Sequence, residues 1–61
     1  MDYGAFGYTE GYYRFKQGLP FIKINRYKAK WRQDAFTTGL KMGWDDAKAG
    51  RKSAVYIYHP K

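Results

Sequence analysis

The stretch of sequence that decides the fold is residues 34–50, DAFTTGLKMGWDDAKAG. Its apolar residues and one glycine recur at intervals of three and four, which places them on one side of an α-helix. Asp34 is a residue type that caps helix N-termini, and Gly50 is a type that ends helices. The stretch therefore predicts a helix over about residues 34–49. Its expected inner face consists of Phe36, Leu40, Gly43, Trp44 and Ala47.

A first helix is expected over about residues 7–17, because aromatic and aliphatic residues again follow a helical period. Gly18 suits the position just after a helix, where left-handed backbone is favoured, and Pro20 prevents continuation. The stripe on this helix consists of Tyr8, Tyr12, Phe15 and Leu19.

Both expected helices carry two glycines four residues apart. Such pairs lie on one face of a helix, where a second backbone could come close. The alternative interpretation is that these positions only tolerate glycine, at a cost of about 1 kcal/mol each relative to alanine. The pairs are Gly7 with Gly11 and Gly39 with Gly43.

The remaining segments are a connector over about residues 20–32 and a tail over residues 53–61. Alternating basic residues in the connector favour a strand, yet Asn25 could cap a helix, and we favour a loop that enters the second helix. Val55, Tyr56, Ile57 and Tyr58 suit a short strand or a tail across the helices. The predicted fold is a single, mostly α domain over residues 1–61: two short helices, a basic connector and a short C-terminal strand or tail.

Composition excludes several classes of protein. The chain has 61 residues, no cysteine and one histidine, so disulfides are impossible and a zinc site lacks ligands. No apolar run approaches the length of a transmembrane helix, and the first residues do not resemble a secretory signal. We therefore expect a cytoplasmic protein without a metal or cofactor and without a membrane partner.

Catalysis is not expected either. Asp45 and Asp46 are adjacent on the second helix, so they point about 100° apart and do not form an acid–base pair. No cysteine nucleophile, oxyanion hole or glycine-rich phosphate loop is evident. We predict a non-catalytic protein with no small-molecule substrate.

The net charge of +7 favours nucleic acid or an acidic protein as the partner. Seven basic residues and no acid lie between Arg14 and Arg32, with aromatic residues set among them. Cations bind phosphates, and aromatic rings stack on unpaired bases, so this segment has both features that recognition of single-stranded or looped RNA requires. Composition does not distinguish RNA from DNA, and a solvated basic face is the alternative interpretation. The predicted RNA-binding residues are Arg14, Lys16, Lys23, Arg26, Tyr27, Lys28, Lys30, Trp31 and Arg32.

Four short motifs occur in a recognisable order: GYYRFKQG at residues 11–18, NRY at 25–27, AF at 35–36 and GWDDA at 43–47. Together they resemble ribosome modulation factor and its small relatives, which include phage-borne proteins. The resemblance implies two helices, binding to ribosomal RNA of the small subunit, and silencing or dimerisation of ribosomes. The matching positions are Gly11, Gly18, Tyr27, Gly43 and Trp44, while Arg26 stands where the family usually has proline.

The predicted function is thus a small basic RNA-binding protein that associates with ribosomes and modulates translation. The alternative is a small protein, of the kind that phages encode, that binds and inhibits an acidic host protein. A third interpretation is an accessory subunit whose exposed aromatic residues pack into a larger assembly.

Overall fold

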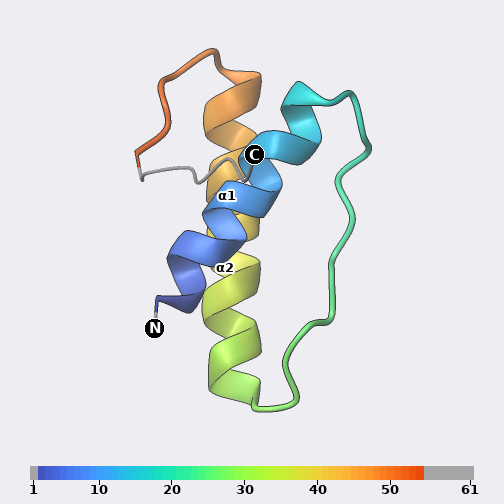
Figure 1. Ribbon diagram of the computed structural model, residues 1–61, viewed down its shortest axis with the longest axis vertical. Helices are drawn as coiled ribbons and strands as arrows, with labels where there is room; N and C mark the ends of the chain where they lie inside the picture. The colour runs from blue at the N-terminus through green and yellow to red at the C-terminus, as the bar shows by residue number, and fades with distance from the viewer. Residues whose placement is uncertain (1, 55–61) are drawn as a thin grey trace, which may run out of the picture.

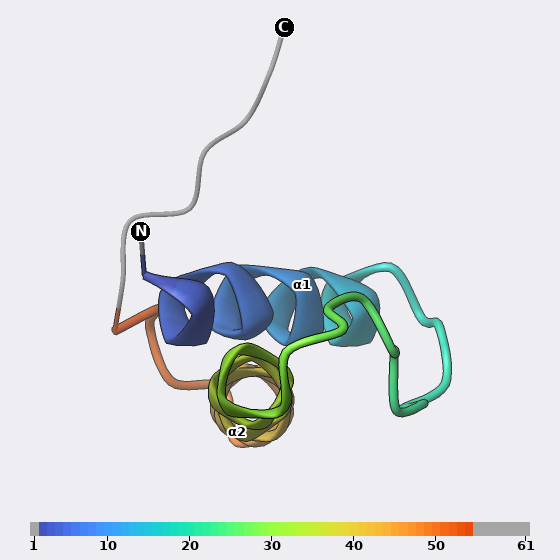
Figure 2. The same ribbon diagram turned by 90° about the horizontal axis from the view of Figure 1, so that it is seen from below.

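The computed structural model describes residues 2–54, which form two helices: α1, Tyr3–Lys16, and α2, Lys30–Lys48. The predicted mostly α class is confirmed. The helices run in the same direction and cross, and the connector returns beside them (Figure 1). Viewed along α2, α1 lies across it (Figure 2). Neither helix is long and apolar enough to cross a membrane, as far as the described residues extend.

The length of the connector follows from this arrangement. Short loops join antiparallel helices, whereas helices that run in the same direction need a connection that returns along their length. With 19 residues, α2 is about 28 Å long. Residues 17–29 could reach roughly 43–47 Å if fully extended. The connector is therefore long enough to return from the end of α1 to the start of α2.

Helix α1 begins at Tyr3, four residues before the expected start near residue 7. The reason is a cap: an Asp2 carboxylate oxygen accepts a hydrogen bond from the Ala5 N–H at 2.9 Å. The end of the helix was predicted correctly, since Gly18 has the left-handed φ of +75°. The Leu19 N–H then closes the last turn by donating to the Arg14 carbonyl at 2.9 Å.

Helix α2 also begins four residues early, at Lys30 rather than at Asp34. The prediction that Asp34 caps the helix is wrong, because Asp34 lies in the second turn and pairs with Lys30 Nζ at 2.7 Å. The connector is a loop up to this point, as favoured. Gly50 ends the helix with a φ of +75°. The predicted tail is described only at Ser53 and Ala54, which form neither helix nor strand; residues 55–61 lie outside the described part.

The two helices touch through their backbones. A Cβ atom on Gly7 would lie 1.9 Å from the Phe36 carbonyl oxygen, and one on Gly43 would lie 2.0 Å from the Tyr8 carbonyl oxygen. No side chain fits at such distances, so the close approach that the glycine spacing indicated is confirmed. The glycines at this crossing are Gly7, Gly11, Gly39 and Gly43.

The core surrounds this crossing and is small. Within residues 2–54, the buried hydrophobic side chains are Tyr8, Phe36, Leu40 and Ala47. Trp44 is only half-buried, with its ring edge-on to Phe15 at 5.2 Å and to Phe21 at 5.5 Å. Phe15 of α1 and Phe21 of the connector thus meet at the same ring of α2.

A glutamine fixes the connector to α2. Gln33 Oε1 accepts hydrogen bonds from the backbone N–H groups of Arg26 at 2.9 Å and Tyr27 at 3.0 Å. Its Nε2 donates to the Ile24 carbonyl at 2.8 Å and to Thr37 Oγ1 at 2.9 Å. One side chain thereby holds three connector residues and sets the path of the chain into α2.

Candidate nucleic-acid interface

The N-terminus of α2 carries positive charge that is only partly compensated, because Asp34 pairs with Lys30 but no acid pairs with the exposed Arg32 within the described residues. Ala29 stands at the cap position, no side chain caps the helix, and its first turn contains no acid. The first turn instead contains Lys30 and Arg32. Cations are unfavourable there, because the aligned peptide dipoles already place partial positive charge at a helix N-terminus. An anion bound at this end would relieve that repulsion.

Exposed aromatic rings lie beside this charge. Trp31 is 64% exposed, and its ring meets Tyr3 edge-on at 5.6 Å. Tyr3 in turn contacts Phe6, which is 43% exposed, at 6.4 Å. The Arg32 guanidinium lies 5.2 Å from the Trp31 ring centre and 5.5 Å from that of Tyr3. We call the following set the α2 N-terminal surface: Tyr3, Phe6, Lys28, Lys30, Trp31 and Arg32.

Four of the nine predicted RNA-binding residues meet on this surface, namely Lys28, Lys30, Trp31 and Arg32. Tyr27 lies beneath it and is half-buried. Its ring packs edge-on against Tyr3 at 4.9 Å and Phe36 at 5.5 Å. Tyr27 thus supports the surface and does not present a free ring to a partner.

The other four predicted residues lie elsewhere. Arg14 donates from Nε and Nη2 to the Pro20 carbonyl, at 3.2 and 3.0 Å, and so ties α1 to the connector. Arg26 pairs with Glu10 at 3.4 Å, and its guanidinium lies 5.0 Å from the centre of the buried Phe36 ring. These two arginines therefore already serve the fold. The remaining two, Lys16 and Lys23, are exposed outside the surface.

Tyr3 and Phe6 were missed as members of the site. The reason is the misplaced start of α1, which left both residues outside the expected helix. The signal was present, because an aspartate that precedes aromatic residues at a spacing of three is typical of a capped helix start. Recognition of Asp2 as a cap would have placed both rings on α1.

A second polar cluster fixes the end of the described chain. The buried Tyr8 hydroxyl donates a short hydrogen bond to Asp46, whose other carboxylate oxygen accepts from Arg51 Nε and Nη2 at 2.9 and 2.7 Å. Burial raises the pKa of Tyr8, and the bond to Asp46 adds to this effect. The same bond, with Arg51, lowers the pKa of Asp46. The cluster holds the segment after α2 against α1.

No protein-family model matches the chain, and no significant match exists among the curated proteins or the solved structures that were compared. The resemblance to ribosome modulation factor therefore rests on the quoted motifs and stays a prediction.

Proposed function

We propose that this protein is a cytoplasmic, non-catalytic RNA-binding protein whose contact region is the α2 N-terminal surface. The observation that carries the proposal is Trp31, a largely exposed ring with the Arg32 guanidinium 5.2 Å from its centre. Two further exposed cations, Lys28 and Lys30, lie within three residues of it in the sequence. Exposure of so large an apolar ring costs solvation free energy, which stacking on an unpaired base recovers. Arg32 and these two lysines suit the phosphates that flank such a base.

The uncapped start of α2 supports the same partner. A phosphate at this end would meet backbone N–H groups, the helix dipole and the Lys30 side chain together. The exposed ring favours single-stranded or looped RNA over a regular duplex, because bases in a duplex are already stacked. Ribosomal RNA offers many such loops. Together with the motif resemblance, this leads us to propose a ribosomal target and a role in modulating translation.

The proposal is tested by titrating the full chain with fragments of small-subunit ribosomal RNA at several salt concentrations. The expected result is binding tighter than about 10⁻⁴ M near physiological salt, with affinity that falls as salt rises. Parallel titrations use single-stranded DNA of the same sequence and an acidic peptide. Tighter binding to the acidic peptide than to every RNA would replace this proposal with an acidic protein partner.

A further inference from the structure

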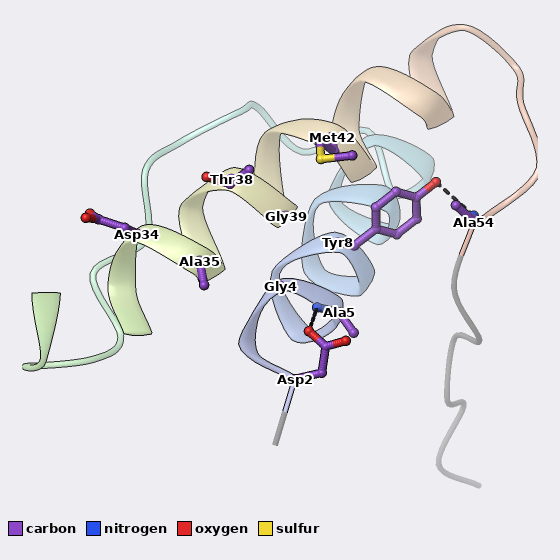
Figure 3. Close-up of a pocket in the computed structure, with 10 residues that line it drawn as sticks. All are labelled: Asp2, Gly4, Ala5, Tyr8, Asp34, Ala35, Thr38, Gly39, Met42 and Ala54. Carbon is purple, nitrogen blue, oxygen red and sulfur yellow. Dashed lines mark hydrogen bonds between the residues drawn. The ribbon is translucent and has the colours of Figure 1, made fainter. Parts of the chain in front are cut away.

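An open groove of about 550 Å³ lies beside the helix crossing, between the first half of α1 and the middle of α2. Figure 3 shows it with its lining residues. Its floor is formed by residues with small or absent side chains, which leave the space between the helices unfilled. They are Gly4, Ala5, Ala35 and Gly39. Met42 stands at its edge with 55% of its surface exposed.

The described chain ends at this groove. Ala54 is one of the lining residues, and its N–H donates to the Tyr8 hydroxyl at 3.0 Å (Figure 3). Three residues earlier, the Arg51 carbonyl accepts a hydrogen bond from the Tyr12 hydroxyl at 2.7 Å. Two tyrosines of α1 thus bring the backbone to one end of the groove. The next residue of the chain must start there.

The residues that follow Ala54 are Val55, Tyr56, Ile57 and Tyr58, the longest run of apolar and aromatic residues after α2. We propose that this segment of the chain is the occupant of the groove and lies along it in extended form. Alternate side chains of an extended segment point to opposite sides. In this arrangement Val55 and Ile57 would face the groove floor, which offers few polar partners, and the two tyrosines would be on the opposite side of the segment.

The dimensions of the groove fit this occupant. Met42 and Asp34 are eight residues apart on α2, which corresponds to about 12 Å along the helix. Four extended residues span roughly 13–14 Å, so residues 55–58 match that length. Asp2 and Asp34 line the groove away from Ala54 (Figure 3). The segment would therefore carry the basic end of the chain toward the acidic end of the groove, where Asp2 caps α1 and Asp34 pairs with Lys30.

Methyl NMR spectroscopy of the full chain tests this inference, independently of RNA. The chain has only two methionines, so the Met42 ε-methyl signal is readily assigned. We expect nuclear Overhauser contacts from this methyl group to Val55 or Ile57. The double substitution Val55→Ser, Ile57→Ser should abolish these contacts. It should also move the Met42 methyl shift to its value in a chain that stops at Ala54. The substitutions lie outside both helices, so the helix pair remains folded.

The matched control is Tyr56→Ser, Tyr58→Ser, which removes two aromatic side chains from the opposite side of the segment. It should retain the contacts between Met42 and the aliphatic pair. The proposal is overturned if the Met42 methyl shift is the same in the full and the shortened chain. It is also overturned if isotope-filtered spectra of mixed labelled and unlabelled protein show that the contacts are between molecules.

Discussion

At the scale of residues, four glycines allow the backbones of α1 and α2 to touch. They are Gly7, Gly11, Gly39 and Gly43. At each, the atoms nearest to an added Cβ belong to the backbone of the other helix. Backbone atoms cannot rotate away as a side chain can. A methyl group at these positions would therefore force the helices apart and loosen the small core around the crossing.

We predict that Gly11→Ala and Gly43→Ala each destabilise the protein by about 1–3 kcal/mol or more, the usual cost of overpacking. If glycine were merely tolerated, the higher helix propensity of alanine would instead add about 1 kcal/mol of stability. Chemical denaturation followed by circular dichroism gives the sign directly, since the midpoint falls in the first case and rises in the second.

Gly4→Ala is the matched control. It adds the same methyl group to the same pair of helices, but its Cβ would lie 3.4 Å from an Asp2 carboxylate oxygen and 3.7 Å from the Ala35 carbonyl oxygen. These are ordinary contact distances. Its midpoint should stay unchanged or rise, and a fall as large as that of Gly43→Ala would contradict the steric account.

Gln33 is another residue with a structural role, because its side chain binds the backbone of the connector. Gln33→Ala removes three hydrogen bonds to the connector and one to Thr37 within α2, and we expect a loss of about 1–3 kcal/mol in the free energy of unfolding. Gln17→Ala, at the exposed end of α1, should change stability by less than about 0.5 kcal/mol. Equal denaturation midpoints for the two variants would show that Gln33 does not anchor the connector.

The cluster of Tyr8, Asp46 and Arg51 predicts a pH dependence. The lowered pKa of Asp46 stabilises the folded state above the unfolded pKa, near 4, and this stability is lost as pH falls through the folded pKa. The raised pKa of Tyr8 means that the folded state favours the neutral hydroxyl. The resulting stability is present below about pH 10 and is lost as pH rises through the folded pKa.

Thermal melts between pH 2 and 7 test the acid limb. Asp46→Asn should be less stable than the natural chain at pH 7 and should lose less stability on acidification. Asp45→Asn changes the exposed neighbour by the same chemistry and should keep the natural pH profile. A natural profile in Asp46→Asn would mean that the carboxylate contributes nothing to the folded state.

At the scale of elements, the periodicity of residues 34–50 and the stripe from Tyr8 were sufficient to predict both helices. The starts were missed because they depend on contacts outside the periodic pattern. Asp2 caps α1 from a position before its stripe, and α2 extends back through Lys30–Gln33 because Gln33 secures the connector there. The ends were predictable, since glycine alone favours the left-handed backbone at positions 18 and 50.

The direction of the helices could not be predicted from such patterns. A basic connector of this length permits a loose antiparallel pair as well as the observed arrangement. The choice depends on which backbone atoms of the other helix each glycine contacts, and the spacing of the glycines does not specify these atoms. The same limit applies to the site. The basic segment was visible in the sequence, but the sequence did not show that Arg14 bonds to Pro20 and Arg26 pairs with Glu10.

The start of α2 supplies a prediction about stacking. Trp31→Leu keeps an apolar side chain but removes the ring, and should weaken binding to single-stranded RNA by about 1–3 kcal/mol, or roughly 5- to 150-fold. The slope of affinity against salt should stay nearly unchanged. Fluorescence anisotropy with labelled RNA measures both quantities.

Met42→Ala serves as the control for loss of an exposed apolar side chain elsewhere on α2. It should leave RNA affinity within about twofold of the natural chain. A similar loss in both variants would indicate nonspecific apolar binding and would count against a stacking role for Trp31.

At the scale of the whole molecule, the net charge of +7 attracts any polyanion, whichever face it meets. Binding by itself therefore does not locate the interface. The central claim is more specific: phosphates are held at the α2 N-terminal surface. It requires that removal of a positive charge from this surface weakens RNA binding more than removal of the same charge elsewhere.

The most direct test compares two double variants of equal charge. The first combines Lys28→Gln with Lys30→Gln, and the second combines Lys41→Gln with Lys48→Gln. All four lysines are exposed, and both variants have a net charge lowered by two. Each is titrated with the same ribosomal RNA fragment across a salt series. We predict that the first variant lowers the slope of log affinity against log salt by roughly 1.4–1.8 units, the value for two lost phosphate contacts. The second should leave this slope nearly unchanged. Equal slopes for the two variants would contradict the claim that the start of α2 is the RNA-binding surface.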